Sequence, residues 1–491
     1  MKKLFLLLFL FSFSIFAQNQ FTEFINYVNS LSDSASKAAA VDSFMTYARS
    51  AGIPFIEENT ANFIYLGNFS SVSVAGDFNG WNQNADAMSK LAGTRLWYKT
   101  KTFELNARLD YKFVRNGNDW ILDPENPNTC TGGFGPNSEL SMPEYVQPWE
   151  IEYNPGIQHG TVEVKNLFST NTNSNYQIKI YLPRGYNPIS SDRYPAVYFQ
   201  DGFEYVDLAY AVNVIDNLID SNKIQKVIGV FVKPNNRNEE YAFSKRNQYR
   251  LFFVNELVPF IDSVYSTIPE APKRLVLGDS YGGNISALIS YNHADVFGNC
   301  GLHSAAFQPN GYEAFNLIVN GSIKDIKFVS IWGTYEPLFT NMRIFRDSLL
   351  TKGYDLKWLE LPEGHSWGLW RATIDGMLEY FFPALPSDVK DYEETSPEGF
   401  NLYQNYPNPF NPTTSLSFVI GKSSFVNLRV YDVLGSEIAS LINEEKSPGF
   451  YEVEFDALSL PAGKAGLPSG IYFYKLDANG FSETKTMVLL K

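Results

Sequence analysis

The chain has 491 residues, of which 44% are hydrophobic and 19% are charged, and its formal net charge is −14. This length predicts about three domains, the composition excludes a disordered chain, and the acidic balance argues against nucleic-acid binding. With only two cysteines and four scattered histidines, the chain lacks the residues for a disulfide scaffold, a thiolate metal cluster or a His-x-x-x-His site.

The N-terminus combines two lysines with an apolar run that ends at Ala17. This pattern predicts a secretory signal peptide over residues 1–17, cleaved near Ala17. The run of about 14 apolar residues is shorter than the roughly 20 that a spanning helix needs. No later stretch is long and apolar enough, so we expect an exported chain without a transmembrane segment. Apolar residues then recur at three- and four-residue spacing over residues 18–55, which predicts one or two amphipathic helices.

Residues 56–145 contain short strand-like runs separated by Gly, Asn and Asp turns. Within them, GDFNGW ends at Trp81, and a later YKF is followed by W-x-x-D-P starting at Trp120. This pattern resembles the early-set β-sandwich related to starch- and glycogen-type carbohydrate-binding modules. Trp81, Trp97 and Trp120 are the candidates for stacking on sugar rings in such a module. The alternative is that they fill the core or shape the neighbouring active site.

Residues 150–384 alternate strand and helix patterns, which predicts an α/β domain with a mostly parallel sheet and helices on both faces. Within it, the apolar strand LVL runs into Gly278-Asp279-Ser280-Tyr281-Gly282, and a helical pattern follows. Strand, G-x-S-x-G and helix in this order are typical of a nucleophile elbow. Glycines permit the sharp turn, so Ser280 is the predicted nucleophile.

A serine nucleophile needs a base and an acid that orients it. His365 follows the strand LKWLEL in a loop that can reach the carboxyl edge of the sheet. The order Ser, acid, His favours Glu336, which follows the strand ending at Gly333. Asp347 and Asp355 are the rival acids. Of the other histidines, His293 is expected on the surface, His303 in a structural role and His159 in an entry loop without a motif of its own.

Two backbone amides are expected to bind the oxyanion. One is Tyr281, and the other comes from the loop after the strand YPAVYF, where Gly202 and Phe203 remain alternatives. Further predicted contacts with the substrate are Asp201, Arg237 and Trp367. Arg237 has an alternative role, in which it pairs with a neighbouring glutamate to fix its loop, and Trp370 is expected in the core.

Residues 150–384 resemble the esterase D-like esterases of the α/β-hydrolase fold, which include enterochelin-esterase-like, feruloyl and acetylxylan esterases. The resemblance is carried by His159-Gly160, IYLPRGY, Gln200-Asp201-Gly202, NRNEEY, NELVP, GDSYGG, GTYEP and GHSWGLWR. It implies a serine esterase that uses Ser280, Glu336 and His365 without a metal or cofactor. Two departures are Tyr281, where relatives often have Met, and Glu336, where the acid is usually Asp.

Residues 385–399 are acidic and contain proline, which predicts a linker. The run NYPNPFNP (405–412) and the strand-like segments after it predict a small antiparallel sandwich over residues 400–491. This segment resembles the C-terminal sorting domain of the type IX secretion system, apart from an insert at 460–468. The resemblance implies a Gram-negative source, contact with the secretion machinery, and release from the cell or attachment to its surface.

The sequence therefore predicts a multidomain protein, an α/β-hydrolase flanked by an N-terminal and a C-terminal β-sandwich. We expect it to hydrolyse acetyl or feruloyl esters on plant polysaccharide. The alternatives are a siderophore esterase of the enterochelin type, a catalytically inactive glycan-binding surface protein and, with less support, a peptidase. Pairing of Cys130 with Cys300 stays open, because the two lie in different predicted domains.

Overall fold

The computed structural model describes residues 20–133, 135–384, 400–405, 407–458 and 466–490. The chain divides into two compact units, Met1–Leu385 and Pro386–Lys491. The predicted signal peptide and linker, and most of the insert at 460–468, lie outside the described residues. We describe each unit by itself.

The first unit begins with two helices on a sheet. Helices α1 (Gln20–Ser30) and α2 (Ser34–Ala51) precede a four-stranded antiparallel sheet in the order β1-β2-β5-β4. Side chains alternate across a strand, so neighbours on β2 enter different clusters: Ile64 packs with the helices and Phe63 packs on the opposite face. The strand bounds are β1 Phe55–Glu57, β2 Thr60–Leu66, β4 Ser89–Lys90 and β5 Leu96–Thr102.

A second antiparallel sheet shares the Phe63 cluster. Its order is β3-β6-β9-β8, and β7 pairs with β6. Val74, Tyr111 and Phe113 of this sheet meet Phe63 in one hydrophobic core. We call residues 56–145 the accessory domain. The strands are β3 Val72–Gly76, β6 Arg108–Arg115, β7 Asp119–Ile121, β8 Thr129–Gly132 and β9 Gly135–Ser141.

The rest of the first unit is built on an eight-stranded sheet in the order β10-β11-β13-β12-β14-β15-β16-β17. The strands from β13 onward in this order are parallel, whereas β10 and β11 are antiparallel to their neighbours. Their bounds are β10 Thr161–Ser169, β11 Ser174–Leu182, β12 Ala196–Phe199, β13 Ile228–Val232, β14 Arg274–Asp279, β15 Asn299–His303, β16 Lys327–Gly333 and β17 Leu356–Leu361.

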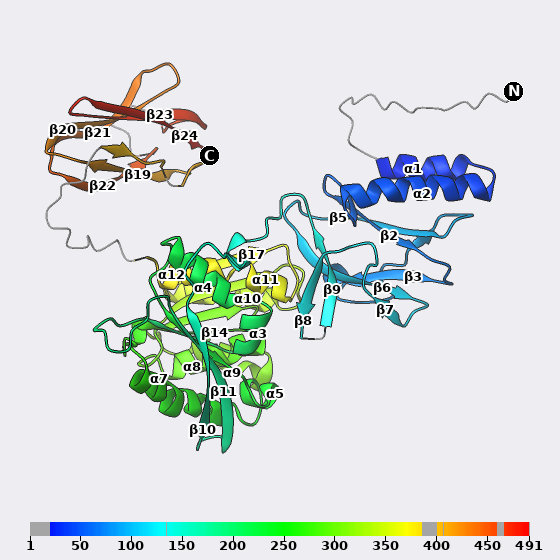
Figure 1. Ribbon diagram of the computed structural model, residues 1–491, viewed down its shortest axis with the longest axis horizontal. Coiled ribbons are helices and arrows are strands. Elements are labelled where there is room, and N and C mark those ends of the chain that lie inside the picture. Colours follow the sequence, from blue (N-terminus) through cyan, green and yellow to red (C-terminus); the bar gives the residue numbers. More distant parts are fainter. Residues whose placement is uncertain (1–19, 134, 385–399, 406, 459–465, 491) are drawn as a thin grey trace. The chain divides into compact units, whose positions relative to one another are not determined.

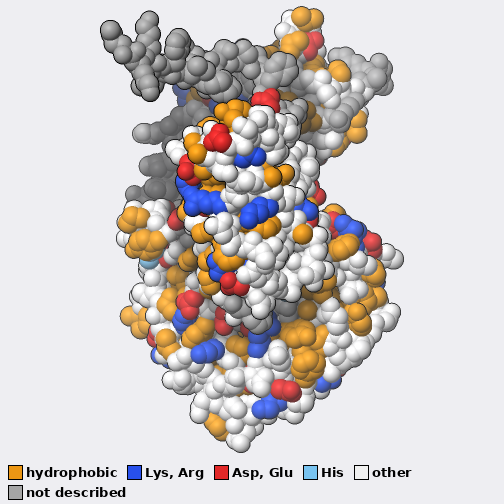
Figure 2. Space-filling model, turned by 90° about the vertical axis from the view of Figure 1, so that its right-hand side faces the viewer, with side chains coloured by type: hydrophobic (Ala, Val, Ile, Leu, Met, Phe, Trp, Pro, Cys, Tyr) orange, Lys and Arg blue, Asp and Glu red, His pale blue; other side chains and the backbone are white. Residues whose placement is uncertain are grey.

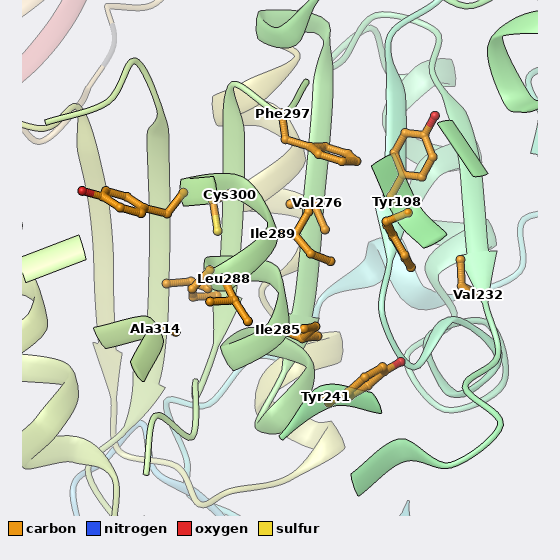
Figure 3. Packing of buried hydrophobic residues seen from close by; sticks show 14 of the residues in the cluster. Tyr198, Val232, Tyr241, Val276, Ile285, Leu288, Ile289, Phe297, Cys300 and Ala314 are labelled. Atoms are coloured by element: carbon orange, nitrogen blue, oxygen red, sulfur yellow. The ribbon is translucent and has the colours of Figure 1, made fainter. Parts of the chain in front are cut away.

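Helices cover both faces of this sheet because its strands are apolar on both sides. Tyr198 of β12 enters one core cluster, and Val197 and Phe199 enter the other. Figure 1 places α4 and α12 on one side and α7 and α8 on the other. Figure 3 shows α8 side chains packed towards Val276 and Cys300. The helices are α3 Gly202–Asp207, α4 Ala211–Asp220, α5 Arg237–Tyr241, α6 Arg246–Phe252, α7 Val258–Val264, α8 Tyr281–Asn292, α9 Pro309–Asn320, α10 Phe339–Lys352, α11 Trp367–Arg371 and α12 Ile374–Phe381.

The second unit consists of two antiparallel sheets around one core. Their orders are β18-β19-β22 and β21-β20-β23-β24, and Phe418 of the first sheet packs in one cluster with Leu428 and Tyr474 of the second. The bounds are β18 Asn401–Leu402, β19 Thr413–Ile420, β20 Ser424–Tyr431, β21 Glu437–Lys446, β22 Gly449–Asp456, β23 Gly470–Ala478 and β24 Phe481–Leu489.

Three general features of the described residues bear on function. None of their helices combines the length and apolarity needed to cross a membrane. On the face shown in Figure 2, acidic and basic side chains are interspersed. Cys130 and Cys300 are both free and buried in different clusters, which answers the open question of their pairing.

Candidate active site

Ser280 stands at the turn between β14 and α8. Its backbone angles, φ 53° and ψ −118°, lie outside the regions that ordinary residues favour. Neighbouring backbone holds this turn, because the Ser280 amide donates to the His303 carbonyl at 2.9 Å and the Ser280 carbonyl accepts from Ala306 at 2.9 Å. Strained backbone of this kind persists where the surroundings determine it and is concentrated at functional sites.

The glycines around Ser280 are required by close packing. A Cβ on Gly278 would lie 2.5 Å from the carbonyl carbon of Gly282, and one on Gly283 would lie 2.9 Å from the Cβ of Ala305. Side chains at these positions would push the strand and the helix apart. The spacing of the motif therefore has a steric cause in this fold.

Glu336 and His365 meet at the carboxyl end of the sheet. His365 Nδ1 lies 2.5 Å from Glu336 Oε2, and Glu336 Oε1 accepts from the Gly333 amide at 3.1 Å. The Glu336 side chain is fully buried, whereas that of His365 is 31% exposed. The rival acids have other partners: Asp347 pairs with Arg346, and Asp355 with Lys327 and Tyr380.

The remaining histidines are committed to other contacts. His303 is buried between the Tyr205 hydroxyl at 2.8 Å and the Thr373 hydroxyl at 3.1 Å, and burial lowers its pKa to about 3. His159 contacts Asp216 and the Asn154 carbonyl. His293 contacts Arg250.

The predicted oxyanion donors begin two helices. Tyr281 is the first residue of α8, and Gly202 and Phe203 open α3, where backbone amides have no acceptor within the helix. A Cβ on Gly202 would lie 2.3 Å from the backbone of Phe231, so only glycine fits against β13. The Phe203 ring lies 4.4 Å from Lys179 Nζ.

Asp201 and Arg237 form an ion pair beside the elbow. The guanidinium donates to both carboxylate oxygens at 2.8 and 2.7 Å, and it reaches the Asp279 carbonyl at 3.3 Å. The expected partner of Arg237 was a glutamate, and this expectation is wrong because two aspartates hold it. Asp201 is 2% exposed, so its carboxylate binds Arg237 and has little surface for a substrate. Burial raises the pKa of Asp279 well above its usual range, and Asp201 adds to this shift.

The tryptophans separate into buried and exposed ones. Trp97 is 7% exposed and donates to the Gly67 carbonyl within the accessory core, so the prediction that it stacks on sugars is wrong. Trp367 is 6% exposed and packs edge-on against Tyr205 and Trp370, which leaves little of it to contact a substrate. Trp120 is 39% exposed and stacks with the half-buried Trp81 at 6.5 Å.

Sequence reasoning missed a cluster of charged residues beneath the His365 loop. Its members are Arg108, Asp110 and Glu139 of the accessory domain and Glu363 and Arg371 of the α/β domain, all at most 9% exposed. The available signal was Arg108-Leu-Asp110 at the start of a strand-like run, which places two opposite charges on one face of the strand. Over the described residues, no group of His, Cys, Asp and Glu is arranged to hold a metal ion.

Two family models match the chain. One is described as "Putative esterase" and covers residues 169–346, and the other as "Secretion system C-terminal sorting domain" and covers residues 404–490. The esterase match includes Ser280 and Glu336 and ends before His365.

The chain is also similar to individual proteins and to solved structures. An uncharacterized protein of Bacillus subtilis is 30% identical over 241 residues, 45% of this chain and 98% of the relative. An endo-1,4-β-xylanase/feruloyl esterase of Xylanibacter ruminicola is 25% identical over 249 residues, 47% of this chain and 32% of the relative. Among solved structures, the enterobactin esterase of Shigella flexneri has a TM-score of 0.56 and 19% identity, over 66% of this chain and 92% of its own.

Proposed function

The chain belongs to the putative esterase family and carries a secretion sorting domain, and from this premise we propose that it is a secreted serine esterase. Ser280 is the nucleophile, His365 the general base and Glu336 the orienting acid. The observation that carries the proposal is the 2.5 Å contact between His365 Nδ1 and Glu336 Oε2, at the same sheet edge as the strained Ser280.

The proposed reaction has two halves. His365 Nε2 takes the proton of Ser280 Oγ, Oγ bonds to the ester carbonyl carbon, and the tetrahedral oxyanion accepts from the Tyr281 amide and from Gly202 or Phe203. His365 then donates its proton to the leaving alcohol as the ester bond breaks. In the second half, His365 activates water, which releases the acid and restores Ser280. Glu336 stabilises the imidazolium in both halves.

We propose acetyl or feruloyl esters on plant polysaccharide as the substrate class. The resemblance of the accessory domain to sugar-binding modules supports this choice, and so does the exposed ring of Trp120 beside Trp81. A curated relative is named as a xylanase and feruloyl esterase. Arg237, which is 35% exposed and also reaches the Asp279 carbonyl next to Ser280, is the proposed polar contact with the substrate.

The test measures release of acetate and ferulate from acetylated and feruloylated xylan by the purified mature protein and its Ser280→Ala variant. Release that depends on Ser280 supports the proposal. Turnover of a trilactone siderophore or a short aryl ester alone would keep the serine mechanism and reject the substrate class. If no ester is turned over, the hypothesis of a catalytically inactive glycan-binding protein replaces that of an esterase.

A second experiment tests the sugar-stacking part. Trp120→Ala should weaken retention on xylan, because a half-exposed ring is the stacking surface. The matched control is Trp149→Ala, since Trp149 is 50% exposed and lies after the accessory domain. Equal retention by both variants would reject stacking at Trp120.

A further inference from the structure

Arg108 of the accessory domain contacts the loop that carries His365. Its backbone amide donates to the Pro362 carbonyl at 3.2 Å, and its Nη1 donates to Ser366 Oγ at 2.9 Å. Ser366 directly follows His365 in the chain. The guanidinium thus binds the residue next to the proposed base.

The loop also fits against accessory side chains at two glycines. A Cβ on Gly368 would lie 2.0 Å from the guanidinium carbon of Arg108, and one on Gly364 would lie 2.0 Å from the carboxyl carbon of Asp77. Because Gly364 precedes His365 and Gly368 follows it, accessory residues contact the loop on both sides of the histidine.

Carboxylates of the accessory domain fix the orientation of Arg108. Its Nε and Nη2 donate to Glu139 Oε2 at 3.0 and 2.6 Å, and Nη2 also donates to Asp110 at 2.7 Å. The guanidinium is planar and rigid, so these bonds determine where Nη1 points. Glu139 also accepts from Arg371 at 2.9 Å, which joins α11 to the same cluster.

The loop that carries Glu336 is held from the same side. The Tyr335 hydroxyl donates to Glu104 at 2.7 Å, and its ring lies 6.3 Å from that of Phe103. The Tyr335 amide donates to the Glu363 carbonyl at 3.0 Å, which ties the acid loop to the histidine loop. Both loops that meet at the 2.5 Å contact are therefore in contact with the accessory domain.

We propose that Arg108 is a positioning residue for His365, so that the accessory domain forms part of the catalytic machinery. Arg108 acts through Ser366 and Gly368 and does not touch the reacting atoms. The proposal rests on the proposed function, in which His365 is the base. Displacing a catalytic group by about 1 Å costs on the order of 100-fold in rate, and at metal sites the residues that orient the ligands from behind contribute about 10- to 100-fold.

The experiment compares the same substitution at two buried arginines in the full mature chain. Arg108→Lys keeps the charge but loses the fork, and we expect kcat to fall about 10- to 100-fold with KM changed less than about threefold. The matched control is Arg274→Lys. Arg274 is 5% exposed, pairs with Asp262 and begins β14, at the opposite end of the strand from Ser280. The kcat of Arg274→Lys should stay within about twofold of the wild-type value.

Two further measurements separate positioning from general stability. Added guanidinium ion should restore part of kcat in Arg108→Ala and none in Arg274→Ala. Ser366→Ala removes only the acceptor of the Arg108 hydrogen bond on the loop, and it tests the positioning role if the Arg108 variants do not fold. The kcat of Ser366→Ala should fall, and an unchanged kcat would overturn the proposal.

The outcomes distinguish this proposal from the one it rests on. If the wild-type activity does not depend on Ser280, the serine mechanism fails. If it does depend on Ser280, and folded Arg108→Lys keeps the wild-type kcat or loses only substrate affinity, the mechanism stands and the positioning role of Arg108 is rejected.

Discussion

Glu363 offers a quantitative test of the buried charge cluster. Its side chain is 2% exposed, its Oε2 has no hydrogen-bond partner among the described residues, and Arg108 Nη1 is 4.0 Å away. Burial raises the pKa of this carboxyl from 4.5 to about 8, which Arg108 opposes and Glu139 reinforces. At neutral pH the folded protein therefore keeps a proton that the unfolded chain releases.

The sign follows from this difference in bound protons. Because the unfolded chain binds fewer protons between pH 4.5 and about 8, the free energy of unfolding falls as pH rises through this window. Each pKa unit corresponds to about 1.4 kcal/mol, so the ionisation of Glu363 alone lowers the free energy of unfolding by about 4 kcal/mol between pH 5 and 9. Glu363→Gln cannot ionise, and its stability relative to the wild type should rise by about that amount over this range.

The assay is calorimetric unfolding of the full mature chain at pH 5, 7 and 9, for the wild type and Glu363→Gln. The control is Glu144→Gln, because Glu144 is exposed and belongs to the same compact unit. The control should follow the wild type at every pH. A constant stability difference between Glu363→Gln and the wild type across the range would refute the assigned protonation of Glu363.

Two further predictions concern the acid Glu336 and the glycine that opens α3. Glu336→Gln should lower kcat by roughly 10³- to 10⁴-fold, because an amide facing Nδ1 favours the wrong tautomer of His365; Asp355→Asn serves as the control in the same kinetic assay, and an equal loss there would contradict the assignment. Gly202→Ala should destabilise the protein by about 2 kcal/mol or more and lower its Tm, because the added Cβ would lie 2.3 Å from backbone atoms. The control is Gly376→Ala, which has open space around the added Cβ and should leave the Tm unchanged or raised.

The nucleophile elbow could be predicted from the sequence because its requirements are local. A turn that brings strand and helix backbones close together requires glycines at fixed positions, and the contacts of Gly278 and Gly283 give this reason in the structure. The apolar runs of β12 and β14 likewise predict a strand buried on both faces. Each of these signals lies within about ten residues of chain.

Features that depend on distant contacts could not be read in this way. Trp97 and Trp120 both lie in strand-like segments, and only the packing of the sheets shows that Trp97 faces the core while Trp120 is exposed. Asp201 was predicted to contact the substrate, but it is buried in an ion pair with Arg237, and this pair joins loops 36 residues apart. The bond from Arg108 to Ser366 spans 258 residues, so no local pattern indicates it.

The residues of the proposed triad are held in place in two different ways, and this difference explains why an accessory domain lies beside the triad. Ser280 is fixed by the sheet itself, since β14 is fully buried and α8 packs on the core (Figure 3). Glu336 and His365 lie on loops beyond the ends of β16 and β17, where the sheet offers no further packing. Contacts from Glu104, Asp77 and Arg108 supply it. A sugar-binding role for this domain and a role in positioning the base are therefore separable, because Trp120 and Arg108 can be changed independently.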